Sequence, residues 1–199
     1  MINTVIFDLS EVQITGLIGV ENSLYPLLKM GKSKILSKLA GSDMLAFFSG
    51  SITEDEYINR VISKNKWPIE SNTLKMLIRK NFKEIKGTRE ILERLKNRGY
   101  KLGLLSVHGK EWIDYISQKF DHHKLFHSTA YSFESGISKP DKRAYLEILK
   151  KLGSKPDESI FIDDNLANLV PAKELGMKTI LFTEPKSLEK ELKAEGITF

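Results

Sequence analysis

The chain has 199 residues, which suits one α/β core with a modest insertion. It contains no cysteine, so disulfide scaffolds, thiolate metal sites and cysteine nucleophiles are excluded, and a reducing, cytoplasmic compartment is expected. The net charge is +5, and the lysines are scattered among glutamates, so we expect no nucleic-acid partner. No stretch approaches the roughly 18–20 apolar residues of a membrane span, so we expect no membrane partner either.

The first predicted element is a short apolar run, Val5–Phe7, that ends on Asp8. Such a run is typical of a strand that is buried on both faces of a parallel sheet. The carboxyl end of that strand is where an acid can stay solvated and still reach a ligand. No secretory leader pattern precedes the run, so secretion is not expected.

Residues 15–86 contain no convincing strand pattern. Thr53 and Glu56 form a capping box, which places the start of one helix. We expect this block to be a small helical cap inserted after the first strand, with residues 1–14 and 87–199 forming the core. Helices are predicted at 33–39, 44–48, 54–63 and 73–82.

From residue 87 the pattern alternates between helix and strand, which indicates βαβ units. Pro140 is expected to open one of these helices, and Gly153 to end it. The predicted fold class is therefore α/β, a doubly wound, Rossmann-like parallel sheet. Helices are predicted at 88–98, 110–118, 140–152, 166–175 and 186–194, and strands at 100–105, 128–132, 159–162 and 179–182.

Four short segments leave a polar group at the end of a strand or the start of a helix. Asp8-Leu-Ser10 follows the first strand, and Ser106 ends the strand at 100–105. Lys139 precedes a helix, and Asp163-Asp164 follows the apolar run 160–162. Two acids at the ends of buried strands suggest a metal and phosphate site at one edge of the sheet.

In order and spacing these segments resemble the four motifs of the haloacid dehalogenase-like hydrolase superfamily, over nearly the whole chain. The runs 136–141, 161–165 and 172–177 are similar to the branch with a small helical cap, which includes sugar-phosphate phosphatases and the phosphatase domain of soluble epoxide hydrolases. The resemblance implies that the Asp8 strand lies centrally in the sheet. It also implies hydrolysis of a small phosphate monoester, so the expected partner is a small phosphorylated metabolite.

The resemblance assigns Asp8 as the nucleophile that forms an aspartyl-phosphate. It implies a Mg²⁺ ion bound by Asp8, Asp164 and the main-chain carbonyl of Ser10, with Asp163 acting through water.

It further implies that Ser106 and the N–H of Val107 bind the phosphate. Lys139 is expected to balance the negative charge and to hold the phosphate in line with Asp8. Asp8, Ser106 and Lys139 are thus the predicted catalytic residues.

Two positions depart from the family pattern. Most phosphatases of this superfamily have an aspartate two residues after the nucleophile, which protonates the leaving group, but this chain has Ser10. The next position is usually glycine, and here it is Glu11. General acid–base help is worth about 10²–10⁴-fold. Three outcomes follow: a preference for good leaving groups, replacement of the acid by Glu11 or His108, or binding without turnover.

The alternatives are a non-catalytic phosphate-binding or regulatory protein and a 2-haloacid dehalogenase, which would need no metal. Ser10, Glu11 and His108 are also predicted to face the substrate. We interpret the other histidines as loop or surface residues and the cap aromatics as core; these are His122, His123, His127, Phe47, Phe48, Tyr57 and Trp67. The oligomeric state, monomer or homodimer, is left open.

Overall fold

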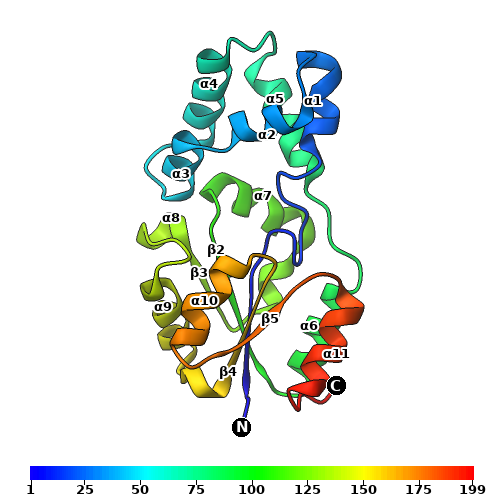
Figure 1. Cartoon of the computed structure of the whole chain (residues 1–199), viewed down its shortest axis with the longest axis vertical. Coiled ribbons are helices and arrows are strands. Elements are labelled where there is room, and N and C mark those ends of the chain that lie inside the picture. Colours follow the sequence, from blue (N-terminus) through cyan, green and yellow to red (C-terminus); the bar gives the residue numbers. More distant parts are fainter.

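The computed structural model describes all residues, 1–199, and has a five-stranded sheet with helices on both faces (Figure 1). All four strand pairings are parallel, and the strand order is β3-β2-β1-β4-β5. The predicted doubly wound α/β class is confirmed, with the first strand at the centre. The strands are β1 (Thr4–Phe7), β2 (Lys101–Ser106), β3 (Ser128–Tyr131), β4 (Ser159–Asp163) and β5 (Lys178–Leu181).

Side chains alternate between the two faces of the sheet, as strand geometry requires. Val5 and Phe7 pack with α6 (Thr88–Asn97) and α11 (Pro185–Ala194) on one face. Ile6 packs with α9 (Lys142–Leu152) and α10 (Leu166–Glu174) on the other. Both faces are therefore covered, which explains why the strands are continuously apolar. The remaining core helices are α7 (Lys110–Phe120), α8 (Ser132–Ser135) and the 3₁₀ turns His122–Leu125 and Pro156–Glu158.

Five helices lie between β1 and α6 and form a separate group above the carboxyl edge of the sheet (Figure 1). Four were predicted within a few residues, but the first was missed. It begins after Gly19, which has no side chain to cap it, and contains Pro26. No strand lies in this segment. The helices are α1 (Val20–Leu28), α2 (Lys32–Leu39), α3 (Ser42–Phe48), α4 (Glu54–Asn65) and α5 (Ser71–Asn81).

The two chain segments that join this group to the core lie side by side. Thr15 N donates to Lys83 O at 2.9 Å, and Ile85 N donates to Gln13 O at 2.8 Å. We propose this short antiparallel ladder as the boundary between a core, residues 1–14 and 87–199, and a cap, residues 15–86. No helix is both long enough and apolar enough to traverse a bilayer.

One predicted helix start was wrong in detail. The helix predicted to open at Pro140 begins at Lys142, because the side chain of Asp141 accepts a hydrogen bond from Arg143 N and caps it there. His122, interpreted as a loop or surface residue, lies in a short 3₁₀ turn but is only 2% exposed, because its ring packs against Phe126.

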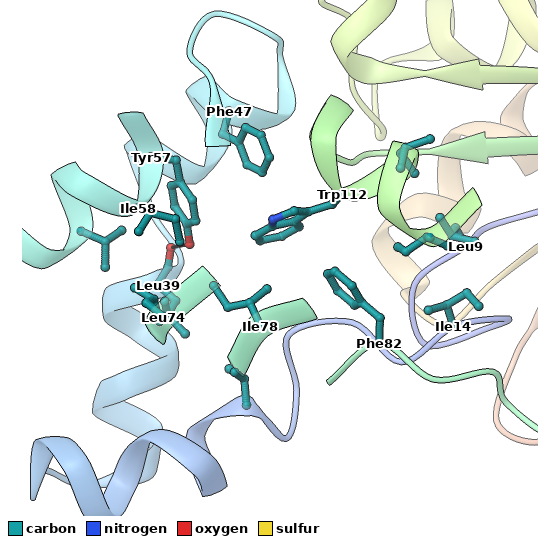
Figure 2. Close-up of a cluster of buried hydrophobic side chains, with 14 of the residues drawn as sticks. Leu9, Ile14, Leu39, Phe47, Tyr57, Ile58, Leu74, Ile78, Phe82 and Trp112 are labelled. Atoms are coloured by element: carbon teal, nitrogen blue, oxygen red, sulfur yellow. Dashed lines mark hydrogen bonds between the residues drawn. The ribbon is translucent and has the colours of Figure 1, made fainter. Parts of the chain in front are cut away.

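One apolar cluster extends from the cap into the core and has Trp112 of α7 near its centre (Figure 2). The Trp112 ring meets Phe47 edge-on at 5.0 Å between centroids and Phe82 at 5.5 Å. Such aromatic pairs add about 0.5–1.5 kcal/mol each beyond the area they bury. Phe47 and Tyr57 are fully buried, so the prediction that they are core residues is confirmed.

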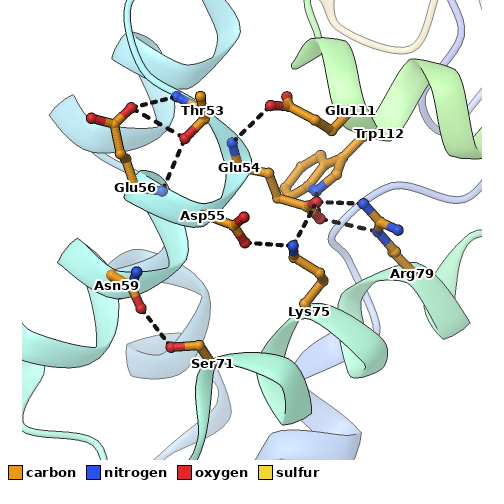
Figure 3. Close-up of polar contacts among 10 residues, drawn as sticks. All are labelled: Thr53, Glu54, Asp55, Glu56, Asn59, Ser71, Lys75, Arg79, Glu111 and Trp112. Carbon is orange, nitrogen blue, oxygen red and sulfur yellow. Dashed lines mark hydrogen bonds and ion pairs between the residues drawn. The ribbon is translucent and has the colours of Figure 1, made fainter.

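A polar network joins the cap to the same tryptophan (Figure 3). The Trp112 indole N–H donates to Glu54 Oε1 at 2.8 Å, and Arg79 forms a bidentate ion pair with the Glu54 carboxylate. Lys75 Nζ lies 3.5 Å from Glu54 Oε2. Glu54 is 1% exposed, so these partners replace the water its charge has lost.

Replacing Glu54 with alanine should destabilise the protein by about 3 kcal/mol, because it leaves the buried indole N–H and a partly buried arginine without partners. Asp55→Ala is the matched control: Asp55 pairs with the same Lys75, but its side chain is 73% exposed. We expect the control to cost less than about 1 kcal/mol. Urea unfolding of both variants measures the difference, and equal losses would contradict the role assigned to Glu54.

Candidate active site

The strand order brings three of the predicted residues to one edge of the sheet. Asp8 follows β1, Ser106 ends β2 and Asp163 ends β4, and β1 lies between the other two. The Asp8 amide donates to the Ile162 carbonyl at 2.8 Å, which continues the β1–β4 ladder and holds Asp8 next to Asp163. All three residues are buried.

Lys139 joins the two buried acids. Its Nζ lies 2.8 Å from Asp8 Oδ1 and donates to Asp163 Oδ2 at 2.6 Å. The lysine side chain is 2% exposed. Burial opposes the charged ammonium, but Asp8 and Asp163 together outweigh it and raise the pKa of Lys139. The predicted position of Lys139, beside the acids, therefore agrees with the geometry.

Asp163 has partners on both of its oxygens. Asn165 N donates to Oδ1 at 2.9 Å, and Asn168 Nδ2 lies 3.1 Å from each oxygen. Sequence analysis missed Asn168; the only signal was its place in the first turn of the helix after the acid pair. With Lys139 on Oδ2, this carboxylate is already well bonded by protein donors. The Asp163 carboxylate is therefore suited to hold Lys139 in place. Any contact that it makes with a metal ion would pass through a water molecule.

Asp8, Asp163 and Asp164 each offer a carboxylate oxygen, and these oxygens lie within 4.8 Å of one another. Burial and the charge of Asp163 raise the pKa of Asp8 to about 7, although Lys139 opposes this. Burial and Asp163 also raise the pKa of Asp164. A cluster of hard oxygen donors that repel one another fits Mg²⁺, which would relieve the repulsion.

The turn after Asp8 is closely bonded. The Gln13 side chain donates to the Asp8 carbonyl at 2.7 Å, and Glu11 N donates to the Ile14 carbonyl at 2.8 Å. The Leu9 carbonyl accepts three amides of the same turn. The Ser10 carbonyl takes no part in these bonds and remains open to another partner. Gln13 is a second supporting residue that sequence analysis missed.

Glu11 has a left-handed backbone, with φ of 58°. Glycine adopts this conformation at little cost, which explains why glycine is usual at this position in the family pattern. The Glu11 carboxylate accepts a hydrogen bond from Gly16 N at 2.7 Å. Burial, and then the charge of Asp164, raise the pKa of Glu11. Glu11 is thus held near the acid cluster in a form that retains a proton more readily than usual.

The Ser106 hydroxyl is buried and has no protein partner. Buried hydroxyls normally have one, so an unpartnered hydroxyl beside Asp8 suits a ligand oxygen. His108 is 2% exposed, and burial lowers its pKa to about 3. Its ring stacks on Phe48 at 5.5 Å between centroids. His108 is therefore neutral at pH 7 and is not a ready proton donor.

A pocket of about 200 Å³ opens beside the turn, between core and cap. Ser10, Glu11, Val107 and His108 line it on the core side, so the structure gathers these predicted substrate-facing residues at one opening. Phe48, predicted as a core residue, also lines the pocket. His127 lies apart and accepts a hydrogen bond from Leu102 N at 3.0 Å.

The family model of the haloacid dehalogenase-like hydrolases matches residues 22–182. The chain belongs to this family. The matched region begins downstream of Asp8 and of the unusual Ser10 and Glu11, so the first motif depends on the geometry described above. The family is the one that the sequence motifs resemble.

Two curated relatives are similar to this haloacid dehalogenase-like hydrolase. Flavin mononucleotide hydrolase 1 of Arabidopsis thaliana is 30% identical over 77% of the chain and 62% of its own length. Glyceraldehyde 3-phosphate phosphatase of Pyrococcus furiosus is 32% identical over 55% of the chain and 46% of its own length. The chain thus spans about half to three-fifths of these relatives.

Solved structures share the fold. A haloacid dehalogenase family enzyme of Bacteroides thetaiotaomicron, in complex with magnesium and inorganic phosphate, has a TM-score of 0.77 at 21% identity and covers 92% of this chain and 96% of its own. A predicted hydrolase of the family from Porphyromonas gingivalis has a TM-score of 0.80 at 18% identity, with full coverage of both chains.

Proposed function

We propose that the protein is a Mg²⁺-dependent phosphatase that hydrolyses a small phosphate monoester through an aspartyl-phosphate on Asp8. The observation that carries the proposal is the bridge made by Lys139 between Asp8 and Asp163, next to Asp164 and at the same sheet edge as the unpartnered Ser106 hydroxyl. This arrangement supplies three things at one edge of the sheet: a nucleophile, a positive charge and a hydroxyl that can donate a hydrogen bond to a phosphate. The relatives named for hydrolysing flavin mononucleotide and glyceraldehyde 3-phosphate support the same chemistry.

In the first step an oxygen of Asp8 attacks phosphorus, and the bond from phosphorus to the ester oxygen breaks. In the second step water attacks the same phosphorus, inorganic phosphate leaves and the Asp8 carboxylate is restored. Lys139 and the Ser106 hydroxyl hold the phosphoryl oxygens. Asp8, Asp164 and the Ser10 carbonyl would bind Mg²⁺, which offsets the repulsion between carboxylate and phosphate when it is bound.

The leaving group needs a proton, and Ser10 is a poor donor. We propose that Glu11 supplies it, because the carboxyl lines the pocket beside Ser10 and has a raised pKa. The proton passes from Glu11 to the departing oxygen, and Glu11 then accepts one from the attacking water. His108 is the weaker candidate, because it is neutral at pH 7.

Removing divalent metal should abolish phosphate release, and added Mg²⁺ should restore it, because the acid cluster repels a phosphate dianion without a cation. The measurement is phosphate release from a panel of phosphate esters, in Mg²⁺ and in EDTA. Hydrolysis of 2-haloacids that survives EDTA would instead favour the dehalogenase alternative. Binding of beryllium fluoride with no turnover of any ester would favour the phosphate-binding alternative.

A further inference from the structure

The pocket between core and cap has few polar side chains in its walls. Its walls are mainly apolar side chains from the cap, from α7 and from the segment that follows β2. Phe82 and Trp112 are buried at its base, whereas Ile18 is 65% exposed at its rim. The apolar lining consists of Leu17, Ile18, Met44, Phe48, Phe82, Val107 and Trp112.

Several polar atoms in these walls already have partners. The Trp112 indole N–H donates to Glu54, and the Phe48 carbonyl accepts from the Ser132 hydroxyl at 2.6 Å. The carbonyls of Gly16 and Ile18 both accept from the Asn81 side chain. The polar side chains left for a sugar or glycerol hydroxyl are those of Ser10, Glu11 and His108, which lie on the core side, so a hydroxyl held against the cap would lose water and gain few hydrogen bonds in return.

Charge also restricts the occupant. No lysine or arginine lines the pocket, and its ionisable side chains are Glu11 and His108. A second phosphate or a carboxylate on the leaving group would therefore meet an acid and no balancing cation. The substrate that fits has one phosphate and an otherwise uncharged remainder.

Size and shape narrow the choice further. A dry apolar cavity of about 150 Å³ in another protein holds one benzene molecule. At about 200 Å³ this pocket has room for one substituted six-membered ring. The aromatic faces of Phe48, Phe82 and Trp112 favour a flat ring, which they can meet by stacked or edge contacts.

We infer that the substrates are monophosphates of alcohols or phenols that have a single flat, uncharged ring, and that this pocket binds the ring. The inference rests on the proposed phosphatase function. The pocket begins at Ser10 and Val107, which lie two residues after Asp8 and directly after Ser106. A ring in the pocket is thus joined to a phosphate at Asp8 by a short link.

The test compares benzyl phosphate with glycerol 1-phosphate, since both release a primary alcohol and differ in the ring. We expect kcat/KM to be about tenfold or more higher for benzyl phosphate. Phe48→Ala should reduce the benzyl value about fivefold or more and should reduce the glycerol value by a smaller factor, so that the preference for the benzyl ester falls. Leu45→Ala is the control, because Leu45 lies on the same helix, is 63% exposed and does not line the pocket.

Ile18→Ser tests the rim at a largely exposed side chain, with Met76→Ser as its control at a matched exposure of 64%. Only the first should lower the preference for benzyl phosphate. Equal kcat/KM values for the two esters, or a preference for glycerol 1-phosphate, would overturn the inference and leave the phosphatase proposal standing.

If neither ester is hydrolysed, that result counts against the proposed phosphatase function. A binding measurement then tests the ring-binding pocket on its own. Calorimetry with Mg²⁺ then compares benzylphosphonate with methylphosphonate, which present the same dianion. Benzylphosphonate that binds about tenfold more tightly, with the difference lost in Phe48→Ala, would support the pocket assignment. Equal affinities would refute it.

Discussion

Replacing Ser10 with aspartate is expected to raise kcat for alkyl phosphates by about 10²-fold or more, within the usual 10²–10⁴-fold range of general acid–base catalysis. An alkoxide is a poor leaving group unless it is protonated as it departs. The new carboxyl would lie two residues after the nucleophile, where family members have their proton donor. Glycine at position 16 leaves room beside the Ser10 side chain, because a Cβ atom built there would lie 3.4 Å from the Ser10 Cβ.

The control is Ser10→Asn, which has the same shape as aspartate but no proton to exchange. Steady-state rates should be compared for an alkyl ester and for an aryl ester with an acidic phenol. The aspartate variant should gain far more on the alkyl ester, because the aryl ester needs little protonation. Equal rates for the aspartate and asparagine variants would show that proton transfer does not limit this protein.

The same series tests the role proposed for Glu11. Glu11→Gln should slow the otherwise unchanged protein on alkyl esters, yet have little effect once Ser10 is aspartate, because one proton donor then replaces the other. Such non-additivity is expected for groups that share a function. If Glu11→Gln lowers the rate by the same factor with serine and with aspartate at position 10, Glu11 does not act as the proton donor. Its role would then be structural, through its φ of 58° and its hydrogen bond from Gly16 N.

The position of Asp8 and Asp163 at one edge of the sheet could be predicted from the sequence because the signals are local. An apolar run such as Ile160–Ile162 that stops on Asp163 has one good explanation, a buried parallel strand with an acid at its exposed end. Parallel pairing then brings Asp8 and Asp163 together without knowledge of any side-chain contact. The same logic does not extend to Gln13 and Asn168, because an amide that bonds across the site has no spacing rule.

The cap shows where local patterns fail. The capping box at Thr53 placed α4 correctly, since both partners lie within one turn. Helix α1 was missed because neither Gly19 nor Pro26 gives a helical signal. The hydrogen bond between Trp112 and Glu54 joins residues 58 positions apart, so no local pattern predicts it. Only the folded structure shows that the Trp112 ring both lines the pocket and bonds to the cap.

Asp8→Asn should reduce phosphatase activity by about 10⁴-fold or more, because the amide cannot form the phosphoenzyme. The same change should stabilise the metal-free protein. An ordinary aspartate titrates near 3.8, whereas burial raises the pKa of Asp8 to about 7. The folded state therefore binds its proton more tightly, and stability falls as pH rises from about 4 to 7.

An asparagine at this position has no charge to bury. In EDTA at pH 8 the variant should unfold about 3–6 °C above the unsubstituted protein, equivalent to about 1–2 kcal/mol, and the gap should close at pH 4. Saturating Mg²⁺ should reverse the order, since a bound ion stabilises only the protein that can hold it. Asp164→Asn, at a more exposed acid of the same cluster, should show a smaller gain in EDTA. If Asp8→Asn is less stable than the unsubstituted protein at pH 8 in EDTA, the ion pair with Lys139 stabilises the fold more than the burial of the Asp8 charge destabilises it. The acids of the cluster would then not repel one another enough to lower the stability of the metal-free protein.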